Sequence, residues 1–194
     1  MFDIAGALRA KTGGGPIIAR RILGAAILES PSGTLIAEDV HGDTTLVGRQ
    51  GRLEARRIAG DLNARTGNGT VTVADVAGSC EIQNHNGRIA ARNMRGPSIR
   101  LKTEAGAISV TQPEVTPSHY ELVSRYGRIT VGVPLMASLA VELSSRTGRV
   151  DSPLAMADMV RDAGGHRLTG LLQGGKYAFK ASSQSGSIRL SGVF

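Results

Sequence analysis

Residues 51–69 read GRLEARRIAGDLNARTGNG, and within this stretch glycine returns every nine residues, at Gly51, Gly60 and Gly69. The same phase holds over half of the chain, at Gly6, Gly15, Gly24, Gly33, Gly42, Gly78, Gly87 and Gly96, with Gly106 after a slip of one residue. Only 26 of the 194 residues are glycine, so composition alone does not produce this run. A fixed short period is typical of repeat architectures, in which each unit packs against its neighbours.

The residues between the glycines alternate in polarity. In the two clearest units, Leu53 and Ala55 or Val71 and Val73 follow glycine by two and four residues, and the residues between them are polar. Side chains two residues apart point to the same side of a strand. Each nine-residue unit is therefore predicted to be a turn at glycine, which tolerates positive φ, followed by a short strand.

A second pattern has twice this period. Apolar residues precede alternate glycines by two positions, at Ile22, Val40, Ile58, Val76 and Met94, whereas the other glycines follow polar residues, as in Asn68-Gly69 and Asn86-Gly87. Two kinds of corner thus alternate, and one coil contains eighteen residues in two strands and two turns. The sequence predicts an all-β fold, a β-solenoid in which residues 6–110 form about six coils that rise roughly 4.8 Å each.

Two other solenoids with a similar period do not fit. A left-handed helix of hexapeptides, counted from Val40, requires an apolar residue at position 52, where the chain has Arg52. A calcium-binding solenoid requires Gly-Gly-x-Gly-x-Asp turns, whereas Asp43 and Asp61 follow single glycines. Both alternatives are excluded.

We expect one domain in three parts. Residues 1–30 form either the first coils or a separate cap, residues 31–110 form the regular solenoid, and residues 111–194 form a less regular continuation with larger coils and a C-terminal cap. Prolines at Pro113 and Pro117 predict a loop over residues 111–117. Residues 151–175 have the composition of a loop excursion, and a helix over residues 17–28 stays open as an alternative to strands.

The C-terminal repeats carry a family resemblance. The segments NGRI (86–89), YGRITV (126–131), TGRV (147–150) and SGSIRL (185–190) resemble the SG/NG-x-I-x-V repeats of the DUF4097 family of adhesin-like proteins. This resemblance implies a right-handed β-solenoid, often in bacterial envelope proteins, with no established catalytic residues. The segments VHGD (40–43) and IAGDL (58–62) are also similar to the repeats of bactofilins, which are cytoplasmic scaffolds that polymerise end to end.

Charge indicates the kind of partner. The chain has a formal net charge of +7, and 19 of its 23 basic residues are arginine. Such a surface attracts nucleic acid, anionic lipid or acidic polysaccharide. No apolar run reaches the roughly 18 residues that span a membrane, and no secretion signal is evident. We therefore expect a cytoplasmic protein as written, or an envelope protein if the chain is truncated.

Four arginines directly follow a glycine, namely Arg52, Arg88, Arg128 and Arg149. Stacked coils would align such positions, so these residues are the candidate anion-binding stripe. Four further arginines would widen it: Arg56, Arg57, Arg92 and Arg95. The alternative is that these arginines only keep a strand surface soluble, paired with Glu54 or Glu81.

No motif for catalysis, cofactor binding or metal binding is found. The histidines have no ligand spacing, at His41, His85, His119 and His166. Cys80 occupies an inward position of the repeat, and three loop carboxylates have no paired acid and base: Asp151, Asp158 and Asp162. We expect no enzyme activity, no cofactor and no metal.

Three functions follow from these observations. The first is a non-enzymatic adhesin-like module that presents stacked strands to a protein or envelope component. The second is a self-assembling scaffold that forms a homo-oligomer through its coil ends, since unpaired strand edges add further strands. The third is a polyanion-binding protein that uses the arginine stripe. The scarcity of aromatic residues (3%) argues against single-stranded nucleic acid as the polyanion.

Overall fold

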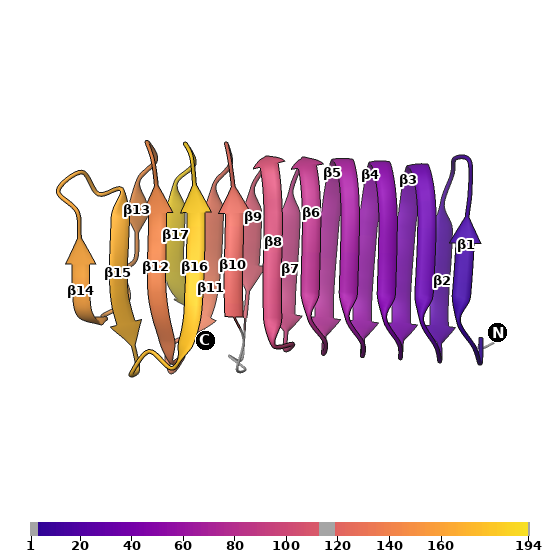
Figure 1. The fold of residues 1–194 in the computed structure, drawn as a ribbon, viewed down its shortest axis with the longest axis horizontal. Coiled ribbons are helices and arrows are strands. Elements are labelled where there is room, and N and C mark those ends of the chain that lie inside the picture. The colour runs from indigo at the N-terminus through magenta and orange to yellow at the C-terminus, as the bar shows by residue number, and fades with distance from the viewer. Residues whose placement is uncertain (1–3, 113–118, 194) are drawn as a thin grey trace.

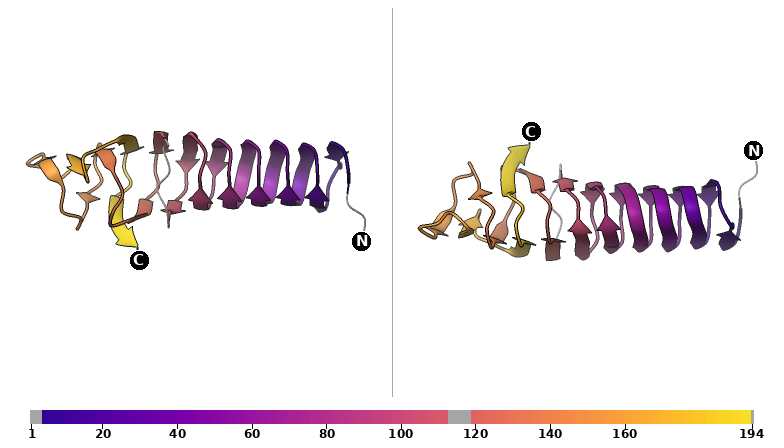
Figure 2. Two further views of the ribbon diagram at one scale, coloured as in Figure 1. Left: turned by 90° about the horizontal axis from the view of Figure 1, so that it is seen from below. Right: turned by 90° about the horizontal axis from the view of Figure 1, so that it is seen from above.

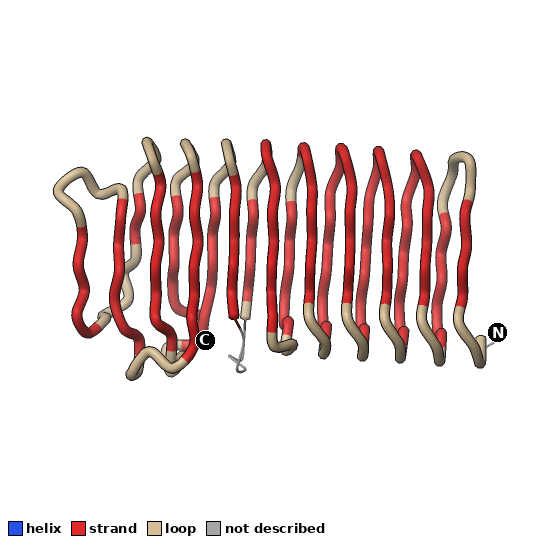
Figure 3. The backbone as a smooth tube through the Cα atoms, in the orientation of Figure 1, coloured by secondary structure: helices blue, strands red, loops and turns tan. Residues whose placement is uncertain are grey.

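The computed structural model describes residues 4–112 and 119–193, and it is an all-β solenoid with coils of roughly 18 residues (Figure 1). Strands form two flattened layers, the front face and the back face of Figure 1, which the views from below and from above separate into two rows (Figure 2). No helix occurs in the described residues (Figure 3). The predicted fold class is confirmed.

The regular part runs from the N-terminal end to the middle of the molecule. Its strands are β1 (Leu8–Lys11), β2 (Ile17–Ile22), β3 (Ala26–Val40), β4 (Thr44–Ile58), β5 (Leu62–Val76), β6 (Cys80–Asn86), β7 (Ile89–Met94), β8 (Ser98–Ala105) and β9 (Ile108–Thr111). Parallel pairing has the predicted period, because Leu35 pairs with Leu53 and Leu53 with Val71. The long strands β3, β4 and β5 continue through the upper corner of Figure 3, so each coil there contains one bent strand rather than two.

The two corners use glycine for different reasons. At the upper corner of the regular coils, from Gly15 to Gly87, the glycines have positive φ, for example 120° at Gly51 and 147° at Gly69. At the lower corner the residues in the left-handed region are instead Arg21, Asp39, Arg57, Asp75 and Asn93. Gly42 at the lower corner is needed because an added Cβ would meet the backbone of Gly24 one coil earlier. The predicted turn at glycine is present at both corners, but at the lower corner the glycine is required by close backbone packing and not by positive φ.

The core is a narrow file of aliphatic side chains between the two faces. Leu28, Leu46 and Ile82 are fully buried on the front face, and Cys80 is also in this file. The inward positions that the glycine spacing predicts are thus core positions. Among the described residues, the fully buried aromatic side chains are Tyr120 and Phe179, both in the C-terminal part of the solenoid.

The C-terminal strands do not stack in chain order. They are β10 (His119–Ser124), β11 (Ile129–Pro134), β12 (Leu139–Ser145), β13 (Val150–Asp151), β16 (Tyr177–Ser183) and β17 (Ile188–Val193). Strand β16 pairs with β10 on one side and β12 on the other, and β17 lies between β11 and β13. The last coil of the chain is therefore inserted between two earlier coils (Figure 1). The rings of Tyr120 and Phe179, 5.5 Å apart, pack across this insertion.

A hairpin covers the far end of the front face. It consists of β14 (Ala157–Arg161) and β15 (Arg167–Leu172), and β15 pairs antiparallel with β12. The expectation of a loop excursion over residues 151–175 is wrong, because the outer edge of β12 offers unpaired backbone groups that these strands satisfy.

Residues 4–30 continue the ladder of the solenoid. Leu8 pairs with Ala26, and Ile17 pairs with Leu35. The helical alternative over residues 17–28 is wrong, because this segment forms β2 and the start of β3. In the predicted proline loop, Thr111 ends β9, and residues 113–118 lie outside the described residues. None of the described residues belongs to a helix that could cross a membrane.

Candidate functional site: an arginine ridge

The upper corner of every coil places one side chain outward directly after glycine. Arg52 is exposed, and the next residue, Leu53, is 2% exposed and points into the core. Adjacent side chains of a strand point to opposite sides. Because Leu53 packs in the core, the side chain of Arg52 points to solvent. The glycine cannot carry a side chain, because a Cβ on Gly51 would overlap the carbonyl of Gly33.

The four predicted arginines lie in one column along this corner. From the N-terminal end the residues of the column are Thr34, Arg52, Thr70, Arg88, Ala107, Arg128, Ser187 and Arg149. Backbone hydrogen bonds connect successive coils, among them Val71 N to Arg88 O (2.9 Å) and Ile188 N to Arg149 O (2.9 Å). Arginine thus alternates with a neutral residue. We call Arg52, Arg88, Arg128 and Arg149 the arginine ridge.

The alternation depends on the inserted coil. Arg128 and Arg149 occupy successive corners in the sequence, yet Ser187 lies between them in the structure. Ile129 N donates to Ser187 O at 2.9 Å, and Arg128 Nε donates to Ser187 Oγ at 3.1 Å. The serine therefore separates two like charges and accepts a hydrogen bond from one of them.

The ridge arginines have no acidic partner among residues 4–112 and 119–193. Other outward columns contain both signs of charge. On the front face the column runs Glu81, Arg100, Glu121, Lys180 and Glu142. Its ion pairs include Arg100 Nε to Glu121 Oε2 at 3.2 Å and Lys180 Nζ to Glu142 Oε2 at 3.3 Å. The ridge therefore holds positive charge that the surrounding surface does not neutralise.

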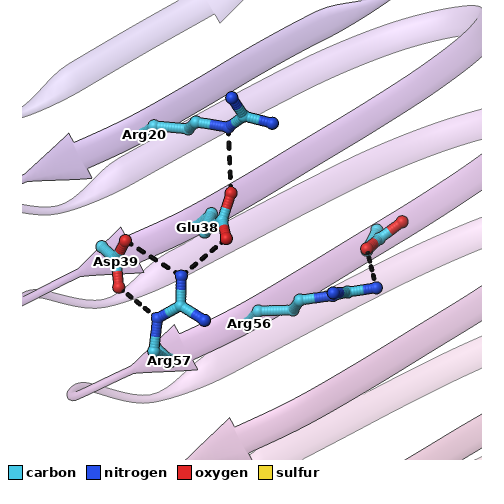
Figure 4. A network of polar contacts seen from close by, with 6 residues as sticks. Arg20, Glu38, Asp39, Arg56 and Arg57 are labelled. Carbon is cyan, nitrogen blue, oxygen red and sulfur yellow. Dashed lines mark hydrogen bonds and ion pairs between the residues drawn. The ribbon is translucent and has the colours of Figure 1, made fainter. Parts of the chain in front are cut away.

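The arginines expected to widen the stripe do not join the ridge. Arg56 and Arg57 lie at the other end of the back-face strand, where Arg56 pairs with Glu54 at 2.5 Å and Arg57 contacts Glu38 and Asp39 (Figure 4). The hydrogen bond from Arg57 lowers the pKa of Asp39.

Arg92 and Arg95 are also at the far end from the ridge. Arg92 belongs to the same column as Arg56, and Arg95 Nε donates to Asn93 at 3.2 Å. The anticipated pairing with Glu54 thus holds for Arg56 and not for the ridge.

A second row, which contains three arginines together with Glu104, was missed by the sequence interpretation. Arg49, Arg125 and Arg146 lie two residues before the corner glycine, and the pentapeptides SRYGR (124–128) and SRTGR (145–149) repeat this arrangement. Arg125 Nε donates to Gln184 Oε1 at 3.0 Å, and its guanidinium lies 5.4 Å from the ring centre of Tyr126. The repeated pentapeptide was a signal that could have identified this row.

Serine side chains brace the same corners. Ser145 Oγ accepts from Gly148 N at 3.0 Å and donates to Gly186 O at 2.9 Å in the neighbouring coil. Ser124 makes the equivalent bonds to Gly127 N (2.9 Å) and Gly106 O (3.0 Å). These bonds fix the backbone on which the arginines stand.

The remaining candidate groups have structural environments. Burial raises the pKa of Cys80 to about 12, so its thiol stays protonated in the core. Asp162 accepts backbone hydrogen bonds from Arg167 and His166, both at 2.7 Å, which lower its pKa. No group of three metal-ligating side chains occurs in the described part of the chain.

Comparison with known proteins gives one match. The family model described as Toastrack DUF4097 matches residues 7–191, which is most of the chain. No curated protein and no solved structure matches.

Proposed function

The chain belongs to the Toastrack DUF4097 family, and we propose that it is a non-enzymatic binding module that holds an anionic partner along the arginine ridge. The observation that carries the proposal is the alternation of Arg52, Arg88, Arg128 and Arg149 with neutral residues along one exposed line. The β-solenoid of this family is not a typical enzyme fold. A rigid row of charges suits binding rather than turnover.

The chemistry of arginine supports an oxyanion partner. A guanidinium is planar, permanently charged and able to bond a carboxylate, sulfate or phosphate through two N–H groups. A single exposed ion pair contributes about 0–1 kcal/mol. Four arginines on one rigid backbone act together, because each contact after the first is intramolecular. The module therefore binds a polymeric anion better than a small one.

Charge reversal tests the proposal. The double variant Arg52→Glu/Arg88→Glu is compared with Arg65→Glu/Arg92→Glu, whose arginines are also exposed but lie on the faces away from the ridge. Both variants change the net charge equally. Binding to heparin is titrated at 50 and 200 mM salt, concentrations between which polyanion contacts weaken strongly. We expect the ridge variant to lose at least tenfold more affinity than the control, and equal losses would refute the proposal.

A second candidate function is association between two copies through the N-terminal edge. Among the described residues, β1 pairs only with β3, and Ile18 and Leu23 nearby are 57% and 51% exposed. Unpaired strand edges recruit further strands. At the opposite end the antiparallel hairpin of β15 and β14 does not continue the parallel ladder that β1 offers, so the association expected is a closed pair of two N-terminal edges rather than a filament.

Sedimentation at two protein concentrations tests this second candidate. The chain should form a concentration-dependent dimer, and Ile18→Lys should shift it to monomer. Filaments would contradict the closed pair, and a monomer at every concentration would contradict the association itself.

A further inference from the structure

We propose that the partner of the arginine ridge is an extended acidic polysaccharide that carries one negative charge per disaccharide. This inference rests on the proposed function and adds the chemical class of the partner and the spacing of its charges. Three observations support it: the regular interval between the ridge arginines, the neutral residues between them, and the side chains that lie beside Arg128 and Arg149.

The interval between ridge arginines is constant. Each is separated from the next by one coil whose residue in the column is neutral, so the interval is two strand spacings, or about 9.6 Å, and Arg52 and Arg149 lie about 29 Å apart. The interval is the same in the regular part and across the inserted coil, where Ser187 occupies the neutral position. Like charges on adjacent strands repel, which explains why the arginines are not adjacent. Repulsion alone does not explain why the positions between them contain no acidic residue.

An extended polysaccharide matches this interval. In a chain with one carboxylate per disaccharide, the charges recur every two sugar rings, and two rings span a length close to two strand spacings. Successive carboxylates on one side of such a chain therefore reach successive ridge arginines.

Nucleic acids match the ridge less well. A straight line along duplex DNA crosses phosphates separated alternately by a major groove of about 12 Å and a minor groove of about 6 Å, so the charges are unequally spaced. Single strands bind through bases stacked on aromatic rings, and the upper corner offers Tyr126 at one coil only. An anionic bilayer attracts each basic residue near its surface whatever the interval between the residues. Only the polysaccharide makes use of the regular spacing.

The three C-terminal corners offer the strongest part of this surface. Arg125 and Arg128 on one coil, and Arg146 and Arg149 on another, flank the inserted coil, whose residues at this corner are neutral. The Nε atoms of Arg125 and Arg128 are held by Gln184 and Ser187 of that coil. This orients the two guanidinium groups and leaves their terminal nitrogens for the ligand. Tyr126, 58% exposed beside them, supplies an apolar ring on which a sugar can stack.

The experiment separates spacing from charge. The double variant Thr70→Arg/Arg88→Thr keeps the net charge and the number of column arginines, but places one arginine beside Arg52 and breaks the interval. Hyaluronan oligosaccharides of two to six disaccharides are titrated calorimetrically against the full chain and this variant. Circular dichroism and thermal melting establish that both are folded.

For the unmodified chain, affinity should rise with oligosaccharide length up to four disaccharides and then level off. The interval variant should bind the four-disaccharide ligand at least tenfold more weakly. Equal affinity for the two chains would overturn the inference, as would tighter binding of duplex DNA or phosphatidylserine vesicles than of hyaluronan. If Arg52→Glu/Arg88→Glu loses heparin while the interval variant is unaffected, the proposed function stands and this inference fails. If neither variant changes binding, both fail.

Discussion

The stacking of the upper-corner glycines makes a prediction that separates backbone strain from steric overlap. Gly15 and Gly51 occupy the same corner with φ of 102° and 120°. A Cβ on Gly51 would overlap the carbonyl oxygen of Gly33, whereas a Cβ on Gly15 has no atom within 4 Å. Alanine at either position pays the left-handed penalty of about 1–2 kcal/mol. Only Gly51→Ala also overpacks the corner, at about 1–3 kcal/mol, and weakens ladder hydrogen bonds of about 1 kcal/mol each.

We therefore expect Gly15→Ala to lower the free energy of unfolding by about 1–2 kcal/mol and Gly51→Ala by about 3–5 kcal/mol. Urea unfolding followed by circular dichroism measures both, with equal slopes required for a direct comparison of midpoints. Loss of folding by Gly51→Ala alone agrees with the reasoning. Equal destabilisation of the two variants would refute it, because the steric term would then be absent.

Three further predictions concern single side chains. Gln112→Leu should destabilise the fold by about 2–3 kcal/mol in urea, because Gln112 satisfies both Met94 N (2.8 Å) and Met94 O (2.7 Å) where the back-face ladder ends; an unchanged midpoint would contradict this. Cys80, with a pKa raised to about 12, should react with a thiol reagent at pH 8 only after unfolding, and rapid native labelling would disprove its burial. Since Arg57 lowers the pKa of Asp39, their contribution to stability is present above the unfolded pKa of about 3.9 and is lost as pH falls through the folded value. Asp39→Asn should flatten the acid limb of the stability profile, and an identical limb would show that the pair contributes nothing.

The regular coils were predictable because both the nine-residue spacing of glycine and the eighteen-residue spacing of apolar residues recur in every coil. Leu53 and Val71 stand eighteen residues apart in the chain and pair in the structure. The repeat did not indicate which residues adopt positive φ at each corner, glycine at the upper corner and a polar residue at the lower one. An aspartate or arginine that occupies the left-handed region, such as Asp39 or Arg57, has no local signature that distinguishes it from a residue on an ordinary strand.

The insertion of the last coil was not predicted, because its segment SGSIRL fits any position in a parallel stack. Charge explains the observed order. If β12 followed β10 directly, Glu121 would face Glu142 and Arg128 would face Arg149, and like charges opposite each other are destabilising. Lys180 and Ser187 of the inserted coil separate these pairs. These charges are present in the sequence, but their effect on the strand order can be recognised only when alternative strand orders are compared.

The candidate site was predicted in part. The four arginines after glycine were expected to align, and the corner brings them into one column. The extension through Arg56 and Arg57 was wrong, because sequence proximity within a coil does not imply the same corner. Arg125 and Arg146 were missed because the repeat pattern considered only the residues that follow each glycine. These two arginines precede the corner glycine by two positions, yet they lie at the same corner as the ridge.

The most direct test of the account is the spatial order of the C-terminal coils, on which the continuous ridge depends. Two cysteine pairs are introduced in a Cys80→Ala background. Thr130→Cys/Arg189→Cys places the cysteines at positions that pair between β11 and β17. Thr130→Cys/Asp151→Cys places them at positions that β17 separates. Neighbouring strands at about 4.8 Å allow a disulfide, whereas Cα atoms beyond about 7 Å do not. We predict that mild oxidation crosslinks the first pair and leaves the second reduced. The reverse result would place Arg149 beside Arg128 and contradict the ridge.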